Sequence, residues 1–148
     1  FHALVEAHYG QQALLDPTDL PGQGHLGIDS DPELDELFEA FVRSEYGNRT
    51  PVAIEAPFAL RLAGRQIIGR IDAVFDDGAG GFEVVDWKTN AERSADPLQL
   101  AIYRLAWAEQ RGLDPAAVTG AFVYVRLGDT VRFDDLPGRA ELETLLSR

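Results

Sequence analysis

Hydrophobic residues recur along the chain with two different spacings, and the changes between these spacings divide it into helices and strands. Near the start, apolar positions fall on one helical face from Phe1 to Leu15, where an Asp-Pro pair ends the helix. The segment from Pro17 to Ser30 is rich in Gly, Pro and Asp and is predicted to be a loop. A second helix is predicted from Asp31, an N-cap residue followed by Pro32 at the first helical position, up to Gly47.

The middle of the chain changes to an alternation of apolar and polar residues, which is the period of a β-strand. Strands are predicted at residues 52–62, 66–75, 82–88, 121–126 and 130–133. Short turns join the first three, which predicts an antiparallel meander. Asp96 and Pro97 then repeat the capping signal and open a helix that runs to about Arg111 and stops at Gly112. With a last helix after Pro137, this order predicts an α/β (α+β) fold with a mixed central sheet flanked by helices.

The 148 residues are enough for one domain with a hydrophobic core and too few for two. The chain contains no methionine and its first residues already lie in a predicted helix, so we expect residues 1–148 to be one domain of a longer polypeptide. The sequence has no apolar run of membrane-spanning length and no signal segment, and no membrane association is expected.

The absence of cysteine restricts the chemistry of any bound metal. Disulfides, thiolate zinc sites and iron–sulfur clusters are excluded, which leaves oxygen or imidazole ligands and favours Mg²⁺ or Mn²⁺. The net charge of −12 opposes a large nucleic-acid footprint, because polyanion binding depends on clustered Lys and Arg. It does not oppose a catalytic site to which another domain delivers the polymer. The acidic run at residues 29–39 is predicted to be a solvated helix face.

Three charged side chains occupy predicted strand positions that should be at least half buried. Asp86 and Lys88 are two residues apart on one strand, so both project to the same face. Asp72 lies on the preceding strand, and the intervening turn places it opposite residue 85 or 86. Two carboxylates this close raise the pKa of one of them unless a cation intervenes. A divalent ion would satisfy them, and a structural salt-bridge cluster is the simpler alternative.

Three stretches carry a family resemblance: GRIDAVF (69–75), EVVDWKT (83–89) and QLAIYRLA (99–106). In this order and on these elements, they resemble the RecB-like branch of the PD-(D/E)XK nuclease superfamily. Such domains occur at the C-terminal end of UvrD/Rep-type and RecBCD/AddAB-type DNA helicases. The resemblance therefore implies a PD-(D/E)XK restriction-endonuclease-like core and a fragment of a longer helicase–nuclease chain that works in the bacterial cytoplasm.

The same resemblance implies the roles of the charged strand residues. Asp72, Asp86 and Lys88 would be the catalytic residues. Asp72 and Asp86 would bind Mg²⁺ or Mn²⁺, with the main-chain carbonyl of Trp87 as a further ligand. Lys88 would position the attacking water and help to deprotonate it. The side chain of Trp87 faces away from its two charged neighbours and is expected to serve packing.

Residues outside these strands also match the family. RecB-like members place a metal-binding His on the first helix, and His2 is the matching position, with His8 a weaker candidate. Gln99 and Tyr103 share a helix face and match the Q-x-x-x-Y motif, which would support the site or contact the DNA backbone. The chain departs from the pattern at Val74, where many members have Arg, and in lacking the cysteines of iron–sulfur relatives.

The expected function is therefore a metal-dependent nuclease that hydrolyses single-stranded DNA, delivered by a linked helicase in repair or recombination. A catalytically inactive nuclease-like module of a helicase is the first alternative. The second, a hydrolase of a small acidic metabolite, has no Gly-rich phosphate loop or nucleophile elbow to support it. Two residues keep two interpretations each. Glu55 is either an acid near the metal ligands or an exposed strand residue, and Arg70 contacts either a phosphate or a neighbouring acid.

Overall fold

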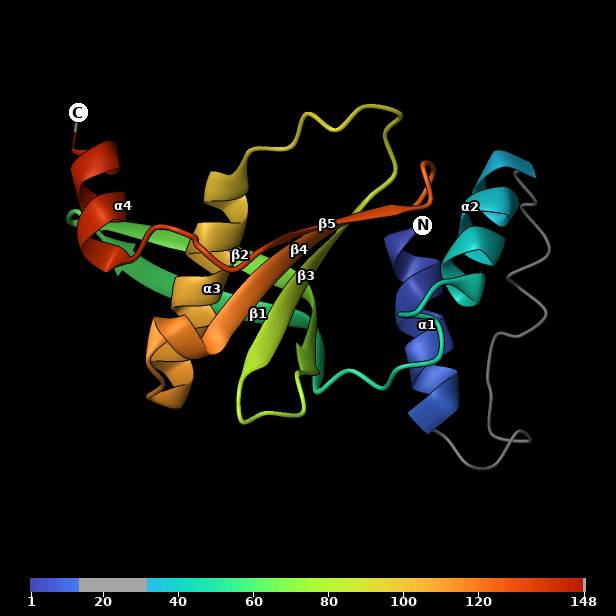
Figure 1. Ribbon diagram of the computed structural model, residues 1–148, viewed down its shortest axis with the longest axis horizontal. Helices are drawn as coiled ribbons and strands as arrows, with labels where there is room; N and C mark the ends of the chain where they lie inside the picture. The colour runs from blue at the N-terminus through green and yellow to red at the C-terminus, as the bar shows by residue number, and fades with distance from the viewer. Residues whose placement is uncertain (14–31, 148) are drawn as a thin grey trace.

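The computed structural model describes residues 1–13 and 32–147 and contains a twisted five-stranded sheet with helices on both sides (Figure 1). The predicted loop at residues 17–30 and the predicted N-cap at Asp31 lie outside the described residues. In chain order the elements are α1 (His2–Ala13), α2 (Pro32–Arg43), β1 (Ala53–Leu62), β2 (Arg65–Asp76), β3 (Phe82–Lys88), α3 (Pro97–Arg111), the 3-10 helix η3 (Pro115–Ala117), β4 (Val118–Tyr124), β5 (Asp129–Phe133) and α4 (Arg139–Leu146).

The strands lie in the order β1-β2-β3-β4-β5. The first three form the predicted antiparallel meander, α3 crosses over to β4, which is parallel to β3, and β5 returns antiparallel. The mixed sheet flanked by helices is therefore confirmed. The largest boundary differences are at α2, which ends at Arg43 rather than near Gly47, and at the start of β4, which begins at Val118 rather than at residue 121; β4 also ends at Tyr124 rather than at residue 126, and other strand ends shift by one residue. The start of β4 was missed because Gly120 looks like a turn residue, whereas its missing side chain leaves room for Leu100 and Leu136.

Helix α3 forms where its capping residues predict it. The Asp96 side chain accepts a hydrogen bond from the main-chain nitrogen of Leu98 at 3.0 Å, and Pro97 occupies the first turn. At the other end, Gly112 takes the left-handed conformation (φ 66°) that ends a helix. The apolar side of α3 packs, together with α4, against one face of the sheet. The core on that face includes Leu62, Val84, Leu100, Leu105, Phe122 and Leu142.

The opposite face of the sheet is covered by α1 and α2. Trp87 is buried there, in edge contact with Phe41 at 5.2 Å between ring centroids, so its side chain serves packing as expected. At the other end of β3, the buried acid Glu83 ties this layer to the sheet. Its Oε1 accepts a hydrogen bond from the Tyr46 hydroxyl at 2.8 Å, and its Oε2 pairs with Arg132 Nε at 3.3 Å.

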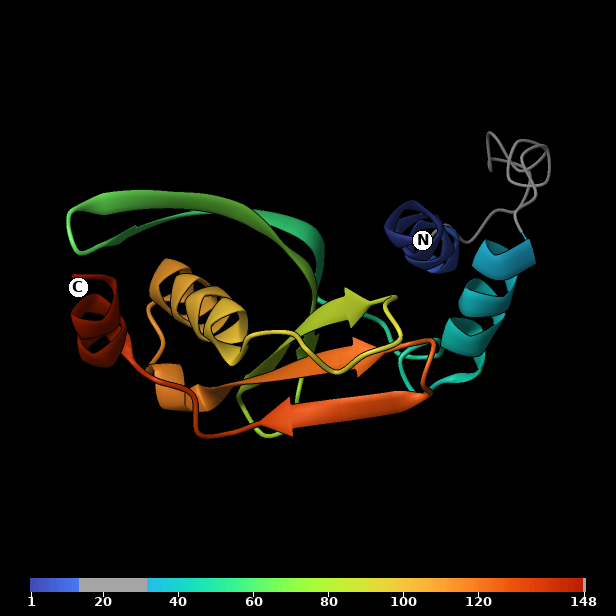
Figure 2. The same ribbon diagram turned by 90° about the horizontal axis from the view of Figure 1, so that it is seen from above.

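The β1–β2 hairpin extends beyond the rest of the sheet and curls over α3 (Figure 2). Strand β2 pairs with β3 only over residues 73–76, whereas its pairing with β1 continues to the turn at Ala63 and Gly64. Gly69 faces Phe58 across this hairpin, and a Cβ at Gly69 would lie 2.9 Å from the Phe58 ring. The missing side chain lets the ring lie across the strand, where it makes edge contact with Tyr103 of α3 at 5.6 Å.

None of the helices in the described residues has the length and hydrophobicity that a bilayer crossing requires.

The contact between Gly69 and Phe58 makes a prediction about stability. We expect Gly69→Ala to lower the free energy of unfolding by about 1–3 kcal/mol, the usual cost of overpacking, because the buried Phe58 ring has to move. In a Phe58→Leu background the same substitution should cost clearly less, because the ring is gone. Denaturant unfolding of the four chains of this double-mutant cycle measures the coupling. Equal costs in both backgrounds would contradict the proposed contact.

Candidate active site

The site lies where β2 separates from β3. The last paired residues are Ala73 and Val85, and the register continued by one residue would set Asp72 opposite Asp86, in agreement with the sequence prediction. Instead of continuing the ladder, Asp72 turns its carboxylate toward β3, where Oδ2 accepts a hydrogen bond from the main-chain nitrogen of Trp87 at 2.8 Å. This bond fixes the Asp72 carboxylate at the open end of the strand pair.

A distortion in both strands of the hairpin accompanies this separation. Strand β1 pairs with β2 on either side of Glu55 and Asp72, but these two residues are not paired themselves. Glu55 has a positive φ of 45°, a conformation that is rare for a residue with a side chain. In a regular strand, residues two apart point to the same face of the sheet. Ile71 and Ala73 are two apart, yet Ile71 lies in the core on the α3 side and Ala73 in the core on the α1–α2 side. The hairpin changes face at Asp72.

Strand β3 supplies the other two charged residues. Asp86 Oδ2 lies 2.8 Å from Lys88 Nζ, and both side chains project toward the α3 face. Asp86 is only 4% exposed. Burial, and next the neighbouring Asp72 carboxylate, raise the pKa of Asp86 to about 7, while Lys88 opposes the shift.

Asp86 is also poorly satisfied for so buried an acid. Lys88 Nζ, 2.8 Å from Oδ2, is its ion-pair partner among the described residues, whereas the Asp72 carboxylate on its other side opposes ionisation. Glu83, three residues earlier on the same strand and similarly buried, has Tyr46 and Arg132 as partners. A buried carboxylate without sufficient partners is costly, and a cation between Asp86 and Asp72 would remove that cost. The residues present therefore fit a divalent ion.

Helix α1 brings His2 to the same place. His2 Nε2 lies 3.2 Å from Asp72 Oδ2, and this hydrogen bond raises the pKa of His2 although burial opposes it. A His can ligate a metal only when neutral, so this ion pair would have to give way. His8 is placed elsewhere, with Nε2 2.8 Å from the carbonyl oxygen of Gly47. In the described part of the chain, no three His, Asp or Glu side chains form a preassembled metal cluster.

Helix α3 supplies the predicted pair Gln99 and Tyr103. Lys88 Nζ donates to Gln99 Oε1 at 3.0 Å, and Gln99 Nε2 donates to the Tyr103 hydroxyl oxygen at 2.9 Å. The pair thus holds the Lys88 amine, which also lies 5.4 Å from the centroid of the Phe122 ring. Phe58 of the hairpin also packs against Tyr103, a contact that was not predicted from the sequence. The signal in the sequence was Gly69, because a glycine within a strand often marks the close approach of another group, here the Phe58 ring.

The two residues with open interpretations are also placed. Glu55 is half-buried beside the site, and its pKa is raised by burial and then by Asp72, so it borders the two aspartates rather than lying free in solvent. Arg70 is exposed and forms no salt bridge with any described acid.

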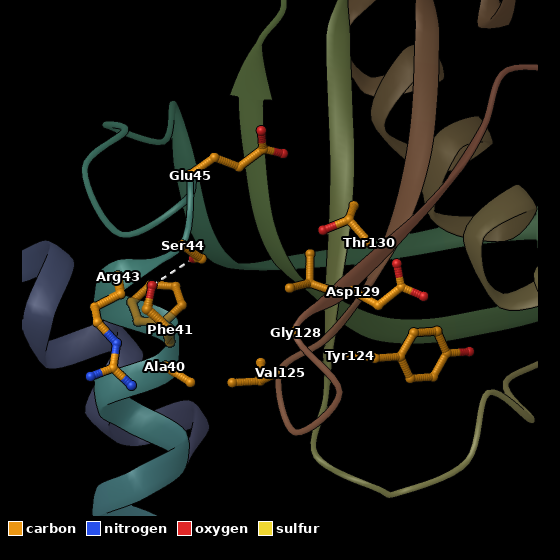
Figure 3. A pocket seen from close by; sticks show the side chains of 11 residues that line it. Ala40, Phe41, Arg43, Ser44, Glu45, Tyr124, Val125, Gly128, Asp129 and Thr130 are labelled. Atoms are coloured by element: carbon orange, nitrogen blue, oxygen red, sulfur yellow. Dashed lines mark hydrogen bonds between the residues drawn. The ribbon is translucent and has the colours of Figure 1, made fainter.

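A cavity of about 420 Å³ lies elsewhere, between α2 and the β4–β5 turn (Figure 3). Its lining includes Phe41, Arg43, Glu45, Val123, Val125 and Thr130. None of the candidate catalytic residues lines it, so the site is assigned from chemistry rather than from cavity size.

Comparison with known proteins gives the family of the chain. Residues 1–145 match the PD-(D/E)XK nuclease superfamily, and the chain belongs to that superfamily. A crystal structure of the protein SSO0001 is similar over 99% of this chain and 68% of that one, with 18% sequence identity and a TM-score of 0.45. No curated protein sequence matches this chain. The superfamily is one of nucleases that generally use divalent metal ions, which agrees with a site built on aspartates.

The raised pKa of Asp86 makes a prediction about stability and pH. The folded chain holds the Asp86 proton more tightly than the unfolded chain, so the free energy of unfolding should fall as the pH rises from about 4 to about 7. In EDTA we expect Asp86→Asn, which cannot ionise, to be more stable than the wild type at pH 8, by roughly a few kcal/mol. The difference should largely vanish at pH 4. Denaturant unfolding at pH 8 and at pH 4 measures the difference in stability. A variant less stable than the wild type at pH 8 would contradict the raised pKa of Asp86.

Proposed function

We propose that this chain is a metal-dependent deoxyribonuclease domain with Asp72, Asp86 and Lys88 as its catalytic residues. The observation that carries the proposal is the closeness of two carboxylates in a buried place: Asp86 is 4% exposed, the neighbouring Asp72 raises its pKa, and the Lys88 amine lies 2.8 Å from its Oδ2. A purely structural ion pair needs one carboxylate for the Lys88 amine, whereas here a second carboxylate lies beside the first, and two close carboxylates repel unless a cation intervenes. Membership of a nuclease superfamily supports the same function.

Asp72, Asp86 and the Trp87 carbonyl would hold Mg²⁺ or Mn²⁺, with His2 as a further ligand. When bound, the ion supplies a bound water of lowered pKa and stabilises charge on the scissile phosphate. Oxygen and imidazole donors suit these ions.

The remaining steps belong to side chains. Lys88, held by Gln99 and Tyr103, orients the water, and in its neutral form the amine takes the water's proton as the water oxygen attacks phosphorus. The bond between phosphorus and the leaving 3′-oxygen breaks in line with the attack, and the 3′-oxygen takes a proton from solvent. By the family resemblance, the products are a 5′-phosphate and a 3′-hydroxyl. The amine also faces the negative charge that develops on the phosphate.

The finer assignment rests on the motifs GRIDAVF, EVVDWKT and QLAIYRLA. We propose that the chain is RecB-like, that a helicase domain of the same or a partner polypeptide delivers single-stranded DNA to it, and that it serves repair or recombination in the bacterial cytoplasm. The net charge of −12 supports delivery, because a chain this acidic holds free DNA weakly. An inactive module of a helicase is the alternative that the metal experiment below decides.

Activity should depend on the charged strand residues. With Mn²⁺ and a labelled single-stranded oligonucleotide, Asp86→Asn and Lys88→Ala should each lower the cleavage rate by about 100-fold or more, because one removes a metal ligand and the other the group that orients the water. Asp76→Asn is the matched control on β2, since asparagine keeps the cap on the Gly78 nitrogen. It should cleave like the wild type. Equal cleavage by all four chains would exclude the assignment.

Metal binding can be measured without any turnover. Mn²⁺ at about 100 times its dissociation constant should raise the free energy of unfolding of the wild type by roughly 2.7 kcal/mol. Asp72→Asn and Asp86→Asn should abolish this stabilisation, and His2→Ala should weaken it. Asp76→Asn should respond like the wild type. If neither calorimetry nor unfolding detects Mn²⁺ binding by the wild type, the inactive helicase module is favoured.

A further inference from the structure

The outer face of the β1–β2 hairpin carries positive charge in a strongly acidic chain. From Ala56 to Ile71 the sequence has three arginines and no acidic residue, although the whole chain has 25 acids among 148 residues. Figure 2 shows that the concave side of the hairpin curls over α3, while no described element covers the convex side. We call this uncovered side the outer face.

The strand register determines which side chains lie on the outer face. Phe58, Leu60 and Ile67 point inward to the α3 core. Their neighbours in the strands alternate to the outer side and are exposed or nearly so. From the turn toward the site, the outer face consists of the facing pairs Arg61–Gln66, Ala59–Ile68 and Pro57–Arg70. Arg65 faces the inward-pointing Leu62 and is exposed at the tip, so it does not belong to the outer face.

The two arginines of the outer face, Arg61 and Arg70, form no salt bridge with a described acid, although the charge of Arg70 lowers the pKa of the nearby Glu55. In contrast, Arg93, Arg126, Arg132 and Arg139 each pair with a carboxylate. Arg61 uses its main-chain carbonyl oxygen to accept a hydrogen bond from Arg139 at 2.8 Å. Its guanidinium group stays available to a ligand.

The outer face leads directly to the candidate active site. The next facing positions after Pro57 and Arg70 are Glu55 and Asp72, where the hairpin changes face. Arg70 is two residues from Asp72, and Gln66, which faces Arg61, is four residues further along the strand, about 13 Å away. The two arginines thus stand at increasing distance from the catalytic carboxylates along one line.

We propose that the outer face of the hairpin guides the phosphodiester backbone of single-stranded DNA to Asp72, with Arg70 and Arg61 each contacting a phosphate. This rests on the proposed nuclease function and adds a path for the substrate. Arginine suits the task because its planar guanidinium group donates two hydrogen bonds to one phosphate.

A polyanion fits this face better than a protein partner. Strand β1 is an edge strand, but Pro57 in its middle lacks the N–H that strand addition by a partner would use. The exposed apolar surface consists of Ile68, 76% exposed, and the small Ala59 and Pro57, with arginines at both ends. Such a face offers charge rather than a hydrophobic patch, which matches phosphates.

The test compares two double variants with the same change in net charge. Arg61→Gln/Arg70→Gln removes the proposed phosphate contacts. Arg43→Gln/Arg111→Gln is the control, because Arg43 and Arg111 are also exposed and without a salt bridge among the described residues, but lie on α2 and at the end of α3. Anisotropy of labelled oligothymidylate, in EDTA and over a range of salt, gives the slope of log affinity against log salt. That slope changes by about 0.7 for each lost phosphate contact on a single strand.

We expect the slope of Arg61→Gln/Arg70→Gln to be smaller than that of the wild type by about 1.4, with weaker binding at low salt, and the control to keep the wild-type slope. Equal changes in both doubles would reduce the effect to net charge and overturn the proposal. An unchanged slope, or no salt-dependent binding by the wild type, would also overturn it and leave the face to a protein partner. The binding measurement in EDTA is independent of cleavage. A wild type that binds as expected here but shows no cleavage in the separate Mn²⁺ assay would overturn the nuclease function and not the guiding face.

Discussion

The separation of β2 from β3 at Asp72 is the structural constraint on which the site depends. Had the ladder continued, a main-chain group would occupy the place of the Asp72 carboxylate, and Asp86 would lie under a closed sheet. Instead, a side-chain hydrogen bond to the Trp87 nitrogen ends the pairing and brings two carboxylates together in a poorly solvated place. The charge that makes the site costly for the folded chain is the charge that a metal ion requires.

Strand alternation divides the work on β3 between its two faces. Glu83 points to the α1–α2 side and is fully occupied with Tyr46 and Arg132, so it holds the layers together. Asp86 and Lys88 point to the α3 side, where Lys88 is the charged partner of Asp86 and the Asp72 carboxylate lies nearby. The contrast between two buried acids three residues apart separates a structural charge from a chemical one. Both kinds are needed, because the N-terminal helices that Glu83 helps to anchor also carry His2 to the site.

Much of the arrangement was predictable because it depends on short-range rules. The Asp96 cap, the left-handed Gly112 and the two-residue spacing of Asp86 and Lys88 act within a few residues, and the structure bears them out. The hydrogen bonds between Lys88 and Gln99 were not predictable from spacing, because they depend on how α3 lies against β3. The support that Phe58 gives to Tyr103 needs the curl of the hairpin as well. The start of β4 failed for a local reason, since a buried glycine and a turn glycine look alike in sequence.

The sequence alone determined the order of elements, the mixed sheet and the identity of the charged strand residues, because periodicity, caps and motif spacing are properties of neighbouring positions. Only the tertiary structure decided that β2 leaves β3 at Asp72, that Asp86 is buried beside a second carboxylate, and that Arg61 and Arg70 share an uncovered face. The desolvation of a charged side chain, and the hydrogen-bond and ion-pair partners it finds, depend on every element packed around it. The residue pattern of one strand does not contain that information.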